Sequence, residues 1–175
     1  FVVLADECYS EIYYKDRPAG ALEVSYQIDV NPERVLIFNS LSKRSNLPGL
    51  RSGFAAGGVN AISELKKLRS YGGAPLPLPL QYAAEAAWKD EKHVTKNREL
   101  YSEKLQIATH LLTDVPDFIP PKAGFFLWLP VENGELAALE IWKRSGVQVL
   151  PGAYLSNINS EIFGGGNPGT DFIRI

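Results

Sequence analysis

Two short apolar runs, each followed at once by polar residues, most constrain the fold of this chain. The runs are Phe1–Ala5 and Arg34–Asn39, and they lead directly into Asp6 and Ser40. Apolar runs of this length are typical of buried strands in an open α/β sheet. Groups that bind ligands gather at the carboxyl ends of strands in such sheets. Two strand ends that carry polar residues therefore predict one convergent pocket.

The residues at these strand ends have the chemistry needed to hold pyridoxal phosphate. Lys43 follows Ser40 and Ser42, and Arg51 comes shortly after them. A lysine amine can form a Schiff base with the cofactor's aldehyde, while hydroxyls and a guanidinium can bind its phosphate. A buried Asp6 can pair with the pyridinium nitrogen and keep the ring an electron sink. We therefore interpret these residues as parts of one site.

The residues around these strand ends include one further candidate for the site and several residues without a site role. Tyr9 lies three residues after Asp6, where its phenol can hydrogen-bond the cofactor's ring oxygen. Cys8 is expected to be a small buried apolar side chain, since no partner indicates a thiolate. Arg44 is assigned no site role. The two histidines have no cysteine or clustered acids nearby, so the sequence predicts no metal site.

Composition excludes several classes of function. The 175 residues carry a formal net charge of −2, so the chain lacks the excess positive charge that is typical of proteins that bind nucleic acid. No apolar run approaches the roughly 20 residues that a membrane helix needs. Cys8 is the single cysteine, so an internal disulfide is impossible and we expect a reducing, cytoplasmic location.

The two ends of the sequence indicate a piece of a longer protein. The chain contains no methionine and begins inside an apolar run, and it stops at Ile175 inside what reads as an unfinished strand. A complete translation product starts with Met. We therefore expect an internal fragment.

Beyond the first two strands, the pattern predicts alternating helices and strands with α/β character. In the first part we expect a strand over 53–58, a helix over 61–71 capped by Asn60, an irregular Gly/Pro-rich segment over 71–81, and one long helix over about 80–113. In the last part we expect strands over 117–121, 124–129, 147–150 and 171–175, a helix over 135–145 ended by Gly146, and a loop over 156–170.

These motifs resemble the class I/II aminotransferases of fold type I, which depend on pyridoxal phosphate. The resemblance covers essentially the whole chain and rests on five stretches: Asp6-x-x-Tyr9, Ser40-x-Ser42-Lys43, Gly49–Gly53, Gly124–Trp128 and Phe172–Ile175. It implies the later part of the large cofactor-binding domain, with a mostly parallel sheet, over residues 1–90. A truncated small α/β subdomain would follow over 91–175, joined by the long helix. Because this is only the later half of such an enzyme, the fragment alone is expected to be inactive.

The resemblance also implies a role for each site residue. Lys43 would bind the cofactor covalently and act as the catalytic base, and Arg174 would bind the substrate's α-carboxylate. The cofactor-binding set would be Asp6, Tyr9, Ser40, Ser42, Lys43 and Arg51.

Within the family, three stretches look most like N-succinyldiaminopimelate aminotransferases of lysine biosynthesis: Ser42–Gly53, Tyr71–Gln81 and Leu150–Leu155. This implies transamination between glutamate and N-succinyl-2-amino-6-oxopimelate in a homodimer. An aspartate or aromatic aminotransferase stays open, as does a lyase or synthase of the same fold, because cofactor-holding residues do not fix which bond breaks. A non-catalytic, aminotransferase-like effector domain of a transcription regulator is the alternative from another class.

Overall fold

A computed structural model describes residues 1–156 and 166–175 of the chain. The chain divides into two compact units. The first contains Phe1–Glu103 and Lys122–Gly124, and the second contains Lys104–Pro121 and Phe125–Ile175. The expected boundary between a large-domain part over 1–90 and a small subdomain over 91–175 refers to the domains of the longer enzyme, and it stays a prediction.

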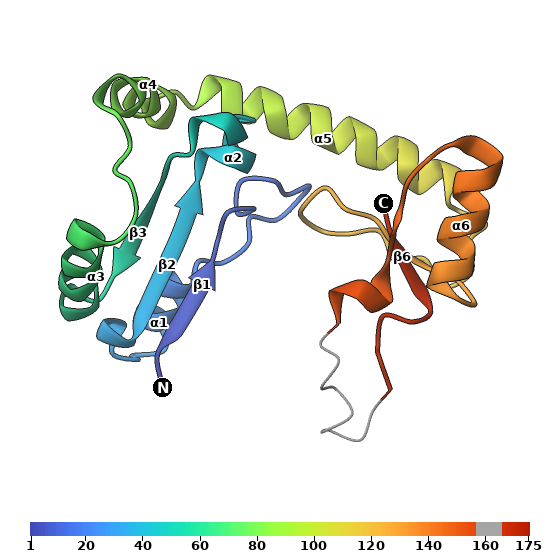
Figure 1. The fold of residues 1–175 in the computed structure, drawn as a ribbon, viewed down its shortest axis with the longest axis horizontal. Coiled ribbons are helices and arrows are strands. Elements are labelled where there is room, and N and C mark those ends of the chain that lie inside the picture. The colour runs from blue at the N-terminus through green and yellow to red at the C-terminus, as the bar shows by residue number, and fades with distance from the viewer. Residues whose placement is uncertain (157–165) are drawn as a thin grey trace. The chain divides into compact units, whose positions relative to one another are not determined.

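The first unit is built on a three-stranded sheet in the order β1-β2-β3 (Figure 1). Its strands are β1 (Val3–Asp6), β2 (Val35–Ser40) and β3 (Gly53–Gly57). β1 and β2 pair in parallel, while β3 runs antiparallel to β2. The helix α1 (Ala21–Gln27) connects β1 to β2 through the 3-10 helix η1 (Pro32–Arg34). The expected α/β layout is therefore confirmed, and this part of the sheet is mixed in direction.

The prediction that the first strand is fully buried is wrong. Phe1 is 101% exposed and Leu4 is 66% exposed, because the described residues leave the faces of β1, the edge strand of their sheet, largely uncovered. The core of this unit lies further along the chain, where six apolar side chains are buried: Ile12, Val35, Leu36, Leu41, Ala84 and Val94.

Small residues in β3 allow its backbone to lie close to neighbouring chain segments. A Cβ atom placed on Gly53 would lie 2.4 Å from the carbonyl oxygen of Asn39. One placed on Gly57 would lie 2.1 Å from the carbonyl oxygen of Val35, and Gly57 has a φ of +151°. Glycine is required at this position both because a side chain would collide with the backbone of β2 and because its φ is one that other residues rarely adopt.

The helix α3 (Val59–Tyr71) begins earlier than predicted and is capped differently. Asn60 lies inside its first turn. The cap comes instead from Glu33 in η1, whose carboxylate accepts hydrogen bonds from the backbone N–H groups of Val59 at 3.0 Å and Asn60 at 3.2 Å. A carboxylate at a helix N-terminus satisfies unpaired N–H groups and complements the helix dipole.

The long helix predicted over about 80–113 is two helices, α4 (Leu78–Lys89) and α5 (Lys92–Leu111). Asp90 interrupts them with an extended backbone, and its carboxylate accepts a hydrogen bond from the Lys92 N–H at 3.1 Å. Asp90 therefore starts the second helix in the manner of an N-cap. α4 also begins within the segment expected to be irregular, because Pro79 in the first turn has no N–H that needs an intrahelical partner.

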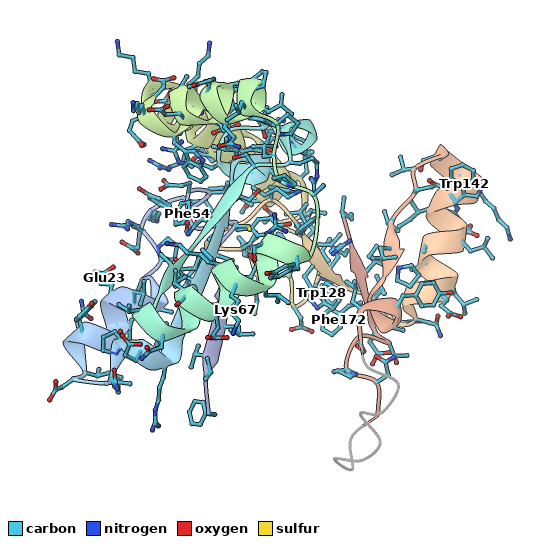
Figure 2. All side chains as sticks on the ribbon, turned by 60° about the vertical axis from the view of Figure 1, so that its left-hand side comes forward. Glu23, Phe54, Lys67, Trp128, Trp142 and Phe172 are labelled. Carbon is cyan, nitrogen blue, oxygen red and sulfur yellow. The ribbon has the colours of Figure 1, made fainter. Side chains whose placement is uncertain are left out.

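The described residues of the second unit form three short antiparallel strands in the order β4-β6-β5. These are β4 (Trp128–Pro130), β5 (Leu150–Pro151) and β6 (Phe172–Arg174), with α6 (Gly134–Ser145) and the 3-10 helix η3 (Gly152–Leu155). The rings of Trp128 and Phe172 stack on adjacent strands with centroids 5.3 Å apart (Figure 2).

Predictions for the second unit had mixed outcomes. The helix over 135–145 is confirmed, with Asn133 as N-cap and Gly146 as left-handed C-cap. The strand expected over 117–121 is absent from the described residues, because the chain turns at Asp117, where φ is +59°. In place of the strands expected over 124–129 and 147–150, β4 and β5 are shorter, begin later and end one residue further on, at Pro130 and Pro151. The loop expected over 156–170 lies largely outside the described residues.

Replacing Gly57 with alanine should destabilise the protein by about 3 kcal/mol, because the new methyl group would collide with backbone at a φ that favours glycine. Gly49→Ala is the matched control, since no heavy atom lies within 4 Å of a Cβ built there. Urea unfolding of both variants measures the difference. Equal stability of the two would contradict the close approach of β3 to β2.

Candidate active site

The pairing register of the sheet brings three sequence segments to one edge. Asp6, the last residue of β1, pairs with Phe38 of the parallel strand β2. Ser40, the last residue of β2, pairs with Gly53, the first residue of the antiparallel strand β3. The residues that follow β1, follow β2 and precede β3 therefore meet at the same end of the sheet. These segments, together with the strand-end residues Asp6 and Ser40, carry all the predicted cofactor-binding residues.

Lys43 lies in α2 (Leu41–Arg44), a single helical turn that begins directly after β2. Ser40 caps this turn, since its Oγ accepts a hydrogen bond from the Ser42 N–H at 3.0 Å. Leu41 is fully buried and fixes the turn against the core. The Nζ of Lys43 lies 5.8 Å from the centroid of the Tyr9 ring, which belongs to the segment after β1. The structure thus brings these two predicted site residues together.

Two hydroxyls and one guanidinium provide the predicted phosphate donors. The Oγ atoms of Ser40 and Ser42 are 2.8 Å apart, and the Ser40 hydroxyl lies 3.3 Å from the carbonyl oxygen of Ser52. Arg51 precedes that residue and has a left-handed backbone, with φ +54°. Its exposed side chain donates from Nη1 to the carbonyl oxygen of Pro48 at 2.8 Å.

Asp6 is exposed, so the expectation of a buried carboxylate is wrong for this chain. This follows from its place at the end of an edge strand. Hydrogen bonds from the side chain and backbone of Cys8 lower the pKa of Asp6 below its usual value. The carboxylate accepts the Cys8 N–H at 3.0 Å. A carboxylate held ionised is the form that pairs with a protonated ring nitrogen.

Cys8 is held as a thiol. Burial, and then hydrogen bonding and charge from Asp6, raise its pKa to about 11, while the positive charge of Lys43 opposes this shift. Its side chain is half-buried. The raised pKa agrees with the expectation that Cys8 is not a thiolate. The expectation that its side chain is buried is wrong, because the residue is partly exposed.

The donor set at this edge fits pyridoxal phosphate. It includes an amine, a carboxylate, a phenol, two hydroxyls and a guanidinium, which match the cofactor's aldehyde, ring nitrogen, ring oxygen and phosphate. Lys43, Tyr9, Ser40, Ser42 and Arg51 all lie on segments that the sheet register brings together.

Arg174 belongs to the second compact unit. It lies in β6, where it pairs with Trp128 on one side and Leu150 on the other. Its guanidinium carbon lies 4.4 Å from the centroid of the Phe126 ring, a cation–π contact. This contact gives the guanidinium a favourable partner although Arg174 lies between the apolar residues Ile173 and Ile175.

Arg44, which sequence reasoning left without a role, anchors the lysine-bearing turn. It is 6% exposed and donates from Nη1 to the carbonyl oxygen of Ala87 at 3.1 Å. It also forms an ion pair with Glu91, and its guanidinium lies 5.1 Å from the Trp88 ring centroid. Sequence offers no signal for these contacts beyond the position of Arg44 next to Lys43.

Sequence reasoning also missed the polar face of α5. His93 hydrogen-bonds to Ser45, and Asn97 donates to the carbonyl oxygen of Lys43. Their spacing of four residues on one face of a predicted helix was the available signal.

Among the described residues, no group of three or more His, Cys, Asp or Glu side chains is placed to hold a metal ion. No described helix is both long and apolar enough to cross a membrane.

Alkylation of Cys8 should be slow at pH 8 and should accelerate with a midpoint near pH 11. A thiol with a pKa of about 11 has roughly a hundredfold less thiolate at that pH than one at 9.0. Asp6→Asn should lower the midpoint, since it removes the carboxylate that opposes ionisation. Iodoacetamide labelling followed by mass spectrometry of the Cys8 peptide measures both. A midpoint near 9 in the unaltered protein would contradict this environment.

Comparison with known proteins agrees with this geometry. The family described as "Aminotransferase class I and II" matches residues 1–172. The chain is 30% identical over 175 residues to the 4-dedimethylamino-4-oxo-anhydrotetracycline transaminase OxyQ of Streptomyces rimosus, covering 99% of this chain and 46% of that protein. It is 33% identical over 157 residues to an LL-diaminopimelate aminotransferase of Desulforudis audaxviator, covering 86% of this chain and 39% of that protein.

A solved structure is similar as well. An aminotransferase from Neisseria meningitidis has a TM-score of 0.93 and 41% identity, covering 100% of this chain and 44% of that one. The chain thus spans less than half the length of these relatives. The predicted fold type I is confirmed. On its family match and on these likenesses, the chain belongs to the class I and II aminotransferases, a family whose members depend on pyridoxal phosphate.

Proposed function

We propose that the full-length protein is a pyridoxal-phosphate-dependent aminotransferase that moves an amino group between an amino acid and a 2-oxo acid. One observation carries the proposal: the sheet register brings Lys43, with its neighbouring hydroxyls, to the strand ends that also carry Asp6 and Tyr9. Family membership supports the same reaction class.

Each site residue has a role that its chemistry supports. Lys43 would bind the cofactor's aldehyde through Nζ, with loss of water. Once the substrate's amino group has displaced this amine from the cofactor, the free Nζ would take up the proton that leaves the substrate's α-carbon. Asp6 would pair with the ring nitrogen, and the Tyr9 phenol would donate to the ring oxygen. Ser40, Ser42 and Arg51 would bind the phosphate. The cofactor supplies an electron sink for the breaking bond.

Arg174 is proposed to bind the α-carboxylate of the substrate. A guanidinium recognises a carboxylate through two parallel N–H donors in one plane. The Phe126 ring, 4.4 Å from the guanidinium carbon, is placed to hold that plane. We also propose a homodimer for the full-length protein, as is typical of the family, and a cytoplasmic location that rests on the single cysteine.

For the substrates we propose glutamate as donor and N-succinyl-2-amino-6-oxopimelate as acceptor. The support is the resemblance of residues 42–53, 71–81 and 150–155 to N-succinyldiaminopimelate aminotransferases. A second candidate is the LL-diaminopimelate aminotransferase reaction, which is supported by relatives of that name at 33% and 30% identity. Both candidates place the protein in lysine biosynthesis.

Borohydride reduction of the full-length protein with pyridoxal phosphate should label Lys43. Lys43→Ala should lose the label and reduce turnover by about a thousandfold or more, because general acid–base catalysis contributes roughly 10²–10⁴. Lys67→Ala, in the exposed face of α3, is the control and should keep both. Mass spectrometry locates the adduct. Labelling spread over surface lysines would overturn the proposed function.

Acceptor preference distinguishes the two candidate reactions. With glutamate as donor, we expect kcat/KM for N-succinyl-2-amino-6-oxopimelate to exceed that for the unsuccinylated acceptor that gives LL-diaminopimelate on amino transfer. Initial rates with each acceptor measure the ratio. The opposite order would favour the second candidate, and activity with oxaloacetate alone would favour an aspartate aminotransferase.

A further inference from the structure

One face of α5 holds the segment that carries Lys43. His93, Asn97 and Tyr101 are spaced four residues apart, so they lie on one side of the helix. Each hydrogen-bonds to a residue between Lys43 and Asn46. All of these residues belong to the first compact unit.

Asn97 makes the central contact. It is 9% exposed, and its Nδ2 donates at 3.4 Å to the carbonyl oxygens of Lys43 and of Arg44. Its Oδ1 accepts a hydrogen bond from the Asn46 side chain. Backbone carbonyls only accept hydrogen bonds, so this arrangement fixes which way the Asn97 amide faces. Both ends of a buried amide are therefore used on the same short segment.

Contacts on either side of Asn97 strengthen this hold. The Nε2 of His93 lies 2.8 Å from the Oγ of Ser45, while its Nδ1 lies 2.7 Å from the Asp90 carboxylate. The Tyr101 hydroxyl donates to the Oδ1 of Asn46 at 3.3 Å. The ring of His93 is thus oriented from both nitrogens.

The lysine-bearing turn needs such external support. α2 has only four residues, and a single helical turn is not stable by itself. The Lys43 amine sits at the end of a flexible four-carbon chain, so the position of its main chain decides where that amine can reach. A misplacement of about 1 Å at a reacting group can cost a hundredfold in rate.

We propose that Asn97 is a positioning residue for Lys43. Its amide holds the main chain at Lys43 and Arg44 and so fixes where the lysine amine meets the cofactor. The positioning of the lysine amine at the cofactor rests on the proposed function. The restraint of the main chain at Lys43 and Arg44 does not depend on that function, and it is measured separately.

The experiment uses the full-length protein and four variants. Asn97→Asp keeps the acceptor for Asn46, has nearly the same shape, and replaces the donor by a charge that faces two carbonyl oxygens. Asn97→Ala removes both ends. Asn46→Gly suits the left-handed φ of +51° at that residue and frees the Oδ1 of Asn97, so it tests the hold if the Asn97 variants fold poorly. Lys96→Ala, exposed at the adjacent position, is the control.

The first readout is hydrogen exchange without cofactor. The N–H groups of Ser45 and Leu47 both donate to the carbonyl oxygen of Leu41. They should exchange about tenfold faster in the Asn97 variants than in Lys96→Ala, and less markedly faster in Asn46→Gly, while amides of β2 keep their rates. Unchanged exchange of these two amides would overturn the proposed hold.

The second readout is the bound cofactor. Covalent labelling of Lys43 at limiting pyridoxal phosphate should slow about tenfold in the Asn97 variants, and the pH midpoint of the cofactor's absorption band should shift by about half a unit or more. If the substitutions only destabilise the protein, the amount of bound cofactor should fall while the pH midpoint of its absorption band stays unchanged. That result would overturn the positioning role of Asn97. If unaltered protein fails to label Lys43, the proposed function fails, and exchange still decides the hold of Asn97.

Discussion

The pairing register between β1, β2 and β3 determines where every candidate cofactor-binding residue lies. Strand side chains alternate between faces, so a slip of one residue would move Asp6 and Ser40 to the opposite face of the sheet and displace the segments that follow them. The register of β3 is fixed by close backbone contact, because Cβ atoms on Gly53 and Gly57 would lie 2.4 and 2.1 Å from carbonyl oxygens of β2. The site is therefore set by the middle strand and by the glycines that let its neighbour approach.

The lysine-bearing turn depends on a second set of contacts, which come from α4 and α5. The guanidinium of Arg44 is almost fully buried, and it is matched by the Ala87 carbonyl, the Glu91 carboxylate and the Trp88 ring. A buried charge that loses its partner is strongly destabilising, so these contacts tie the turn firmly to the helices. Sheet and helices thus constrain Lys43 from two directions.

The sequence indicated which strand ends carry polar residues better than it predicted the boundaries of the elements. Apolar runs that end in polar residues identify the strand ends, and Lys43 follows from that pattern. The cap of α3 could not be predicted, because Glu33 is distant from it in sequence and reaches it only in the folded chain. The break at Asp90 was hidden by helical periodicity on both sides. The exposure of β1 depends on which chain segments cover the sheet, and local pattern carries no information on that.

The left-handed backbone at Arg51 places two demands on one position. A φ of +54° favours glycine, asparagine or aspartate, and an arginine held there pays a conformational penalty. Arg51 is proposed to bind the cofactor's phosphate, and the planar fork of N–H donors that suits this role is absent from glycine, asparagine and aspartate. Selection for thermal stability alone would therefore drift away from arginine at this position, whereas selection for cofactor retention would keep it. Arg51 is the place where a directed-evolution campaign would meet the conflict between robustness and activity.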